Sequence, residues 1–303
     1  MPLQIVLATD GSDDAMAAAR LLTRLPLAPD TNLVVVTVLP PAPALPDLPA
    51  ANAAELIALT HSAATEASTG LLSSTETSLA SLNLPVVSVV RTGHPSAEIV
   101  ELAEELGADL IVVGARGRSA TPGFALGAVA HEVVRHAPCA VLVARGEGRP
   151  PGRILVAVDG SAHASAALHS LAWFPLPGDA QVQVLSVVQP FDPLGGSPVP
   201  KHLEHPMAEI RRQEWAVATR VAAEARAWLA ERGWRGDEPE VREGQPAYEI
   251  LRAASELEAD LIVIGSRGQR GGTGYLLGSV AQKVVRYATC SVLVTKRVMS
   301  DES

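Results

Sequence analysis

Short apolar runs alternate with longer helical segments along the whole chain. In the first half, runs rich in Val and Ile are bounded by Pro, Gly or Asp, a pattern that predicts strands. The five runs lie at 3–8, 33–39, 85–90, 109–113 and 140–144. The segments between them predict helices at 12–25, 53–82, 95–106 and 127–136, with Gly70 as a point where the second helix could break. Strands that alternate with helices predict a parallel sheet covered by helices on both faces.

The second half of the chain repeats the first. Strands are predicted in the same order at 153–158, 181–188, 239–242, 260–264 and 291–295. Gly93 and Gly244, which begin two similar segments, lie 151 residues apart, as do the two cysteines, Cys139 and Cys290. A period this long exceeds that of solenoid repeats. Each copy is therefore expected to be a whole domain with its own core.

A run of Gly, Pro and charged residues joins the two copies. Residues 145–152 read Arg-Gly-Glu-Gly-Arg-Pro-Pro-Gly, a composition that favours neither strand nor helix. We therefore expect two domains, at 1–146 and 152–298. Each is predicted to be a Rossmann-like α/β domain with five parallel strands flanked by helices. The loops that follow the second strand, 40–49 and 189–206, differ most between the copies and are either lids over a site or plain connectors.

Composition excludes several classes of protein. The formal net charge of −9 argues against a general nucleic-acid binder, which needs a large basic surface. No apolar run approaches the ~20 residues of a membrane span, and no basic leader precedes the first strand. We therefore expect a cytoplasmic protein that binds neither nucleic acid nor membrane. Cys139 and Cys290 hold equivalent positions in different domains, so we expect small buried apolar residues rather than a disulfide or a metal pair.

Two loops in each copy follow strands whose carboxyl ends should meet, which is where open parallel sheets bind ligands. The first loop carries Asp10 in one copy and Asp159 in the other. The second has glycines at identical spacing, namely Gly114, Gly117 and Gly127 in the first copy and Gly265, Gly268 and Gly278 in the second. Such glycines let backbone amides approach a phosphate, and the last one begins a helix whose free N–H groups favour an anion. Arginines at 116, 118, 267 and 270 add positive charge.

Both loops also have purely structural interpretations. The glycines could serve only to make turns. The aspartates could cap the following helices together with Ser12 and Ser161, a role that is compatible with ligand contact. The glycine pattern is neither G-x-G-x-x-G after the first strand nor a P-loop, because the Gly-Lys-Ser/Thr ending of a P-loop is missing.

At these residues the chain resembles the universal stress protein family in its tandem two-domain form. The family's nucleotide-binding members carry Gly-x2-Gly-x9-Gly followed by Ser or Thr. Ser279 completes this pattern in the second copy, whereas Ala128 stands at that place in the first. The resemblance implies an ATP-binding stress-response regulatory protein, with magnesium as a candidate companion of the phosphates. It also implies an intramolecular pseudo-dimer through the last strands, 140–144 and 291–295, with a homodimer as a further option.

The resemblance implies nucleotide contacts at matching positions of both copies. In the first copy these are Ala8, Thr9, Asp10, Val38, Val113, Gly114, Gly117, Gly127, Ala128 and Val129. In the second copy they are Ala157, Val158, Asp159, Val187, Ile264, Gly265, Arg267, Gly268, Gly278, Ser279 and Val280. The aspartates would lie near the adenine and ribose, the valines of the second strands would pack on them, and the glycine loops would hold the phosphates.

Catalytic groups do not recur in the two copies. His163 aligns with Asp14, and His131 aligns with Gln282. His202 and His205, three residues apart, are expected to be solvated in a Pro-rich loop rather than to bind a metal. Nucleotide occupancy is therefore expected to bias conformation or partner binding, with at most slow ATP hydrolysis. The alternatives are an adenylating or ATP-hydrolysing enzyme on the same scaffold and a nucleotide-free interaction scaffold.

Overall fold

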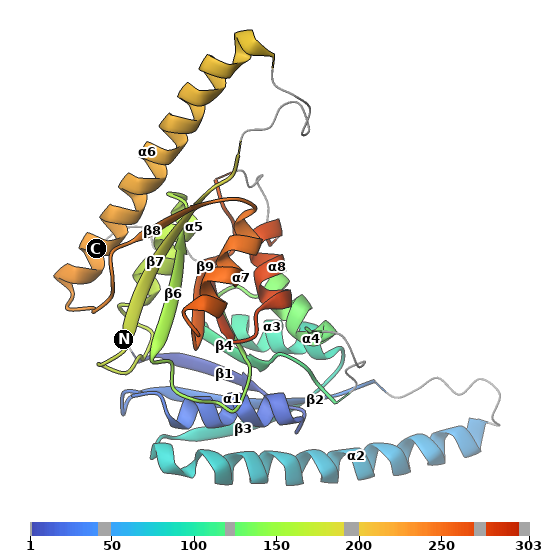
Figure 1. Cartoon of the computed structure of the whole chain (residues 1–303). Coiled ribbons are helices and arrows are strands. Elements are labelled where there is room, and N and C mark those ends of the chain that lie inside the picture. The colour runs from blue at the N-terminus through green and yellow to red at the C-terminus, as the bar shows by residue number, and fades with distance from the viewer. Residues whose placement is uncertain (1, 42–49, 119–124, 191–199, 270–276, 297–303) are drawn as a thin grey trace. The chain divides into compact units, whose positions relative to one another are not determined.

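Figure 1 shows the computed structural model of the chain, which describes residues 2–41, 50–118, 125–190, 200–269 and 277–296. The chain divides into two compact units, Met1–Arg149 (unit 1) and Pro150–Ser303 (unit 2). The division falls inside the Gly- and Pro-rich segment 145–152.

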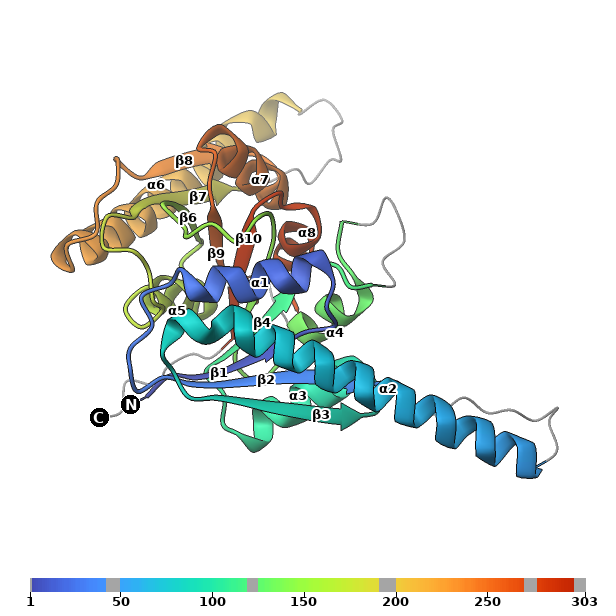
Figure 2. The same ribbon diagram turned by 90° about the horizontal axis from the view of Figure 1, so that it is seen from below.

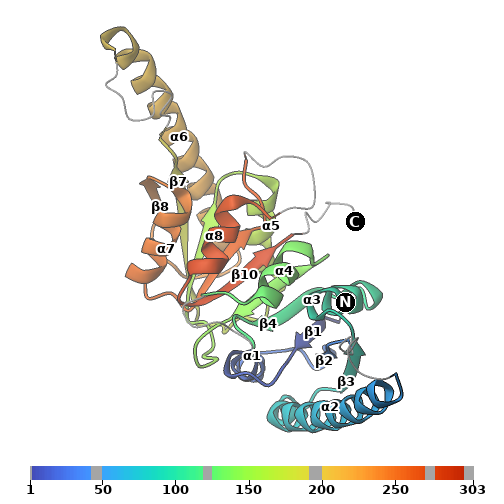
Figure 3. The same ribbon diagram turned by 90° about the vertical axis from the view of Figure 1, so that its right-hand side faces the viewer.

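Unit 1 is a parallel sheet between two layers of helices. Its strands are β1 (Gln4–Ala8), β2 (Asn32–Leu39), β3 (Val86–Thr92), β4 (Leu110–Gly114) and β5 (Ala140–Ala144). They are ordered β3-β2-β1-β4-β5, and every neighbouring pair is parallel. One face carries α1 (Asp13–Thr23) and α2 (Ala50–Leu79), which continues into the short 3-10 helix η1 (Ala80–Leu82); the other carries α3 (Pro95–Glu105) and α4 (Ala128–His136) (Figures 2 and 3). The strand order reverses between β1 and β4, whose carboxyl ends therefore frame a switch point.

Unit 2 has the same architecture. Its strands are β6 (Arg153–Val158), β7 (Gln181–Val188), β8 (Glu240–Glu243), β9 (Leu261–Gly265) and β10 (Ser291–Thr295). They are ordered β8-β7-β6-β9-β10 and are parallel throughout. The helices are α5 (Ala162–Ser170), α6 (Lys201–Glu231), α7 (Pro246–Glu256) and α8 (Ser279–Tyr287). The switch point of this unit lies between β6 and β9.

Aliphatic side chains form the core of each sheet. Ile5, Val6 and Leu7 of β1 have no exposed surface, and the same is true of Leu155 and Val156 of β6. Full burial of such a side chain stabilises the fold by about 1.5–3 kcal/mol. Strands covered on both faces need continuous runs of these residues, which is why the apolar runs predicted the strands closely.

The predicted break in the second helix is wrong. Helix α2 runs through Gly70 without interruption, and no heavy atom lies within 4 Å of the place where a side chain would begin there. A glycine inside a helix costs only about 1 kcal/mol relative to alanine. Contacts of α2 with β2 and β3 on the sheet outweigh that cost.

The histidines at 202 and 205 are exposed, as expected, but they do not lie in a loop, so that part of the prediction is wrong. His202 and His205 belong to the first turns of α6, which begins at Lys201 directly after Pro200. Proline is tolerated before a first turn because the amide it lacks has no partner there. The two segments considered as lids, 40–49 and 189–206, are described only in part, because residues 42–49 and 191–199 lie outside the described residues.

Two further findings concern the described part of the chain. No helix in it is long and apolar enough to cross a membrane. It also contains no cluster of three or more His, Cys, Asp or Glu side chains arranged to hold a metal ion. Cys139 is buried, and Cys290 is partly exposed.

Candidate functional site

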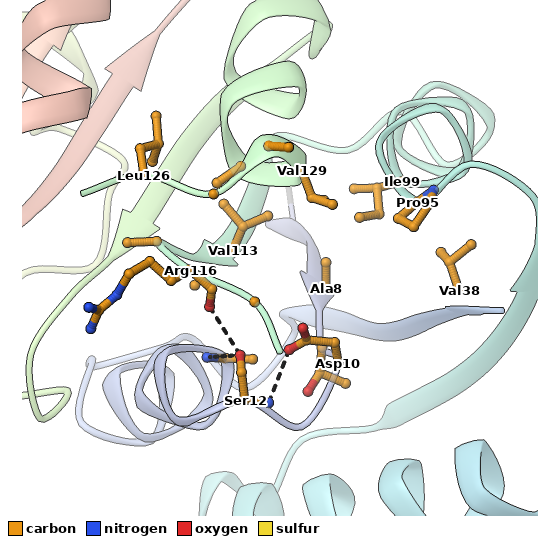
Figure 4. A pocket seen from close by; sticks show the side chains of 18 of the residues that line it. Ala8, Asp10, Ser12, Val38, Pro95, Ile99, Val113, Arg116, Leu126 and Val129 are labelled. Atoms are coloured by element: carbon orange, nitrogen blue, oxygen red, sulfur yellow. Dashed lines mark hydrogen bonds between the residues drawn. The ribbon is translucent and has the colours of Figure 1, made fainter. Parts of the chain in front are cut away.

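A cavity of about 420 Å³ opens at the switch point of unit 1, beyond the carboxyl ends of β1 and β4 (Figure 4). All ten residues predicted for the first copy, from Ala8 to Val129, line it. Nine further residues line it that the prediction did not include: Ser12, Ala15, Val36, Pro95, Ile99, Ala115, Arg116, Leu126 and Ala130. The glycine-spaced loops thus meet at one place, as expected for the ends of neighbouring parallel strands.

The cavity has an apolar end and a polar end. Figure 4 shows Val38 from β2 facing Pro95 and Ile99 from α3 across one end of the space. Ser12, at the start of α1, and Arg116, in the loop that leads to α4, lie at the other end. A ligand that fits both ends has an apolar part and an anionic or strongly polar part.

Asp10 joins the two loops that form the polar side. Its Oδ1 accepts a hydrogen bond from the Ser12 backbone N–H at 3.0 Å, and its Oδ2 accepts one from the Arg118 N–H at 2.8 Å. The helix cap is Ser12, whose Oγ accepts from the Ala15 N–H at 3.3 Å. Asp10 is therefore a bridge between the loop after β1 and the loop after β4, and the capping role belongs to the serine alone. Each carboxylate oxygen retains a lone pair for a ligand.

Protein packing accounts for the first two glycines of the loop. A Cβ on Gly114 would lie 2.5 Å from the backbone carbon of Asp14, and one on Gly117 would lie 2.6 Å from the Asp10 Oδ2. A Cβ atom essentially never comes within 3.0 Å of a heavy atom to which it is not bonded. These two glycines are required by the approach of α1 and of the Asp10 carboxylate, whether or not a ligand is present.

Gly127 has a different environment. Its backbone is the extended N-cap of α4, with φ −76° and ψ 156°, a conformation open to any residue. A Cβ there would lie 3.3 Å from the Ala115 carbonyl oxygen, so the neighbour would need to shift by only a few tenths of an ångström. No side chain caps α4. Gly127 therefore leaves the cavity open toward the first N–H groups of the helix, where an anion is stabilised.

Unit 2 repeats this backbone arrangement. Asp159 accepts from the Ser161 N–H at 2.9 Å and from the Gln269 N–H at 3.0 Å, and the Gln269 side-chain amide also donates to the Asp159 carbonyl. A Cβ on Gly268 would lie 2.6 Å from the Asp159 Oδ2. Gly278 is the N-cap of α8 and, like its counterpart, has no side-chain cap.

The other residues predicted for the second copy lie on the corresponding elements. Ala157 and Val158 end β6, Val187 lies near the end of β7, Ile264 and Gly265 end β9, and Ser279 and Val280 begin α8. Ser279 is exposed, so its hydroxyl is accessible at the start of the helix, where Ala128 of unit 1 presents a methyl group. Arg267 lies in the loop after β9 and is partly exposed.

The charged groups around the two loops differ between the units. In unit 1 the Arg116 guanidinium pairs with the Asp14 carboxylate through Nε at 3.0 Å and Nη2 at 3.4 Å. In unit 2 the position of Asp14 is held by His163, whose Nδ1 lies 3.4 Å from the Ser266 Oγ. Burial lowers the pKa of His163, and the positive charge of Arg267 lowers it further. His163 is therefore neutral where Asp14 is negative.

The sequence did not predict several residues that come to the cavity, or to its rim, from distant parts of the chain. The Asp14–Arg116 pair joins positions 102 residues apart, and no local pattern signals it. Pro95 belongs to the Gly-x-Pro element that recurs at Gly244, and this repetition is a signal that the element reaches the site. Ile99 follows one turn later on the same face of α3.

Comparison with known proteins assigns the family. The sequence model described as the universal stress protein family matches the chain twice, at residues 1–145 and 151–296. Universal stress protein YxiE of Bacillus subtilis is 34% identical over 149 residues, which make up 48% of this chain and 98% of that protein. Universal stress protein Rv2623 of Mycobacterium tuberculosis is 29% identical over 217 residues, which make up 67% of this chain and 65% of that protein.

A solved structure gives the same fold over both units. The crystal structure of a universal stress protein from Archaeoglobus fulgidus is similar with a TM-score of 0.65, covers 97% of this chain and 98% of its own, and is 20% identical in sequence. At this identity the likeness concerns the fold alone. The two matches of the family model leave out only the linker and the last residues of the chain. The chain therefore belongs to the universal stress protein family and carries two copies of its domain.

Proposed function

We propose that each unit binds an adenine nucleotide, ATP above all, and that nucleotide occupancy regulates the contacts of the protein with partners in a stress response. The observation that carries this proposal is the cavity of unit 1, which combines an apolar end with an uncapped helix start. Its volume of about 420 Å³ falls in the range of pockets that hold small ligands.

The two ends of the cavity suit the two ends of a nucleotide. Val38, Pro95 and Ile99 offer flat apolar contact to a purine base. Gly127 and the first N–H groups of α4 offer hydrogen bonds and a positive dipole end to phosphate. A base in the first place and phosphates in the second satisfy both ends at once.

Asp10 lies between these two ends and suits the ribose. Its carboxylate is oriented by the two backbone N–H groups that it accepts from, so little conformational freedom is lost when a ligand hydroxyl donates to it. Asp10 is also the only carboxylate among the described residues that line the cavity. Magnesium would therefore be held mainly by the phosphates, as is usual for this ion.

The direct test is to identify what the purified protein carries. We expect denatured protein to release an adenine nucleotide, identified by mass spectrometry, and titration calorimetry with ATP and magnesium to detect binding. The double variant Gly127→Asp, Gly278→Asp places a side chain and a negative charge at both helix starts and should lose the nucleotide.

Gly178→Asp is the matched control for this experiment. It makes the same chemical change at a turn before β7, at the amino ends of the strands and away from the site. No heavy atom lies within 4 Å of the place where its side chain would begin. This variant should keep the nucleotide. If wild-type protein releases no adenine nucleotide and millimolar ATP produces neither heat nor a change in melting temperature, the proposal is wrong and the nucleotide-free scaffold takes its place.

A further inference from the structure

One position in the first helical turn distinguishes the two sites by charge. Asp14 in α1 and His163 in α5 occupy it, and each packs its backbone against the first glycine of the loop after the fourth strand of its unit. A Cβ on Gly114 or on Gly265 would lie 2.5 Å from the backbone carbon of the respective residue. The two backbones are therefore equivalent here, while the side chains are a carboxylate and a neutral imidazole.

In unit 1 this carboxylate engages the arginine that lines the cavity. Asp14 is largely buried, with 13% of its side chain exposed, and holds Arg116 by two contacts from the guanidinium. Figure 4 shows the Arg116 side chain running away from the side of the cavity that holds Asp10 and Val38. The pair neutralises a cation that would otherwise attract phosphate, and it restrains the guanidinium at the edge of the cavity.

In unit 2 the same position adds no negative charge. His163 contacts the Ser266 hydroxyl, and burial together with the nearby charge of Arg267 lowers its pKa, so the imidazole is uncharged near neutral pH. The residue before it is Ala162, where unit 1 has a second carboxylate, Asp13.

The local charges follow from these differences. Among the described residues of the two loops and the first helical turn, unit 1 has three carboxylates and two arginines, and unit 2 has one carboxylate and one arginine. Each site can therefore have its own tolerance for ligand charge.

We propose that the residue at this position sets how strongly each site favours additional phosphate groups, so that unit 2 prefers a nucleoside triphosphate over a monophosphate more strongly than unit 1 does. This rests on the proposed nucleotide binding. Asp14 is a positioning residue, because it acts through Arg116 and through its charge rather than by touching the ligand. An added phosphate charge some 10 Å from a carboxylate, at the effective dielectric constant near a protein surface, changes affinity by about tenfold.

The test compares ATP and AMP at each site separately. The site of unit 1 is measured in a Gly278→Asp background and that of unit 2 in a Gly127→Asp background, by calorimetry near pH 8 without divalent metal. We expect the ratio of ATP affinity to AMP affinity to be about tenfold higher in unit 2. Asp14→Asn should raise the ratio in unit 1 about tenfold, and His163→Asp should lower it in unit 2 by a similar factor.

Controls separate charge from structure. Asp30→Asn removes the same charge from an exposed loop before β2, at the amino ends of the strands, and should leave the ratio of ATP affinity to AMP affinity unchanged. Asp14→Glu retains the charge and should keep the low ratio of unit 1. A loss of fold would lower both affinities together, so it would not change their ratio as the proposal requires. Should Asp14→Asn fail to fold, the His163→Asp variant tests the same rule in the other unit.

Two outcomes are distinguishable failures. This inference would be overturned if both units bind with the same ratio of ATP affinity to AMP affinity, or if Asp14→Asn and His163→Asp leave that ratio unchanged. Nucleotide binding itself would remain established in either case. No affinity for either nucleotide in either background or in the wild type would overturn the proposed function, and the inference with it.

Discussion

The site of unit 1 and its counterpart in unit 2 share a backbone and differ in the side chains that line it. In both units an aspartate bridges two loops, two glycines make room for that aspartate and for the following helix, and a third glycine begins an uncapped helix. The differences include Asp14 against His163, Arg118 against Gln269 and Ala128 against Ser279. Packing requires the first two glycines, and all of these features recur in both units, so they cannot make the two sites differ in ligand preference. Ligand preference must come from the residues that differ.

The largest expected effect tests the claim that packing requires the shared backbone. Gly114→Ala and Gly265→Ala should each destabilise their own unit by about 3 kcal/mol, because the new methyl group overlaps the backbone of the first helix. Urea unfolding measures this, and tryptophan fluorescence reports unit 2 alone, since all four tryptophans lie after residue 172. Gly70→Ala, at an open position in α2, is the control and should stabilise the fold by about 1 kcal/mol. Unfolding of Gly265→Ala at the wild-type urea concentration would contradict the packing argument.

The aspartate bridges should differ in strength. Asp10→Ala leaves the N–H groups of Ser12 and Arg118 without their acceptor and should cost about 2 kcal/mol. Asp159→Ala should cost about 1 kcal/mol less, because the Gln269 side chain still donates to the backbone carbonyl of residue 159. The free energies of unfolding of the two variants decide this, and equal losses would show that the Gln269 contact adds nothing. Gln269→Ala combined with Asp159→Ala should then remove the difference.

The hydroxyl at the helix start should have a smaller effect, confined to ligand affinity. Ser279→Ala should weaken ATP binding in unit 2 about fivefold, the equivalent of one hydrogen bond of about 1 kcal/mol. Ala128→Ser should strengthen binding in unit 1 by a similar factor. Calorimetry on proteins with the other site disabled measures both changes. ATP affinities that respond to neither substitution would place the phosphates away from these helix starts.

The smallest expected effect is a pH dependence of unit 2 that arises from His163. The pKa of His163 is lowered from its ordinary value of 6.5. Between the lowered pKa and 6.5 the unfolded chain therefore binds the proton more readily than the folded unit. The stability contributed by neutral His163 is thus complete above 6.5 and is lost as the pH falls below that value.

The measurement compares wild type with His163→Asn by tryptophan fluorescence in urea at about pH 7.5 and about pH 5.5. Wild-type unit 2 should lose more stability than the variant on acidification. His61→Asn, an exposed position on α2 of unit 1, should unfold like wild type in this assay. If His163→Asn shows the same acid sensitivity as wild type, His163 is not the group responsible.

The sequence predicted the sheets well because their strands are buried on both faces. The runs at 109–113 and 140–144 match β4 and β5 to within one residue, since a strand such as Leu110–Gly114 has no exposed face to interrupt the apolar pattern. Helix limits were harder to predict. The continuity of α2 through Gly70 depends on packing against the sheet, which outweighs local preference. The first turns of α6 are exposed, so the helix extends to Lys201 without such packing.

The candidate site could be predicted in its backbone and not in its charges. The identical spacing in the two copies predicted that the loop glycines and Asp10 lie close together, and in the structure they line one cavity. The Asp14–Arg116 pair, the His163–Ser266 contact and the approach of Ile99 depend on which side chains meet across distant segments. Periodicity and spacing carry no information about contacts between side chains that lie far apart in the sequence.

The bridge made by Asp10 also has a kinetic consequence. Because this carboxylate accepts hydrogen bonds from the Ser12 and Arg118 amides, we expect the loop after β1 and the residues that directly follow β4 to move together. The cavity is then expected to open and close on the opposite side, where Pro95 and Ile99 of α3 face Val38. The residence time of a bound molecule would thus be governed by how tightly α3 packs on the sheet, through side chains that never touch a phosphate.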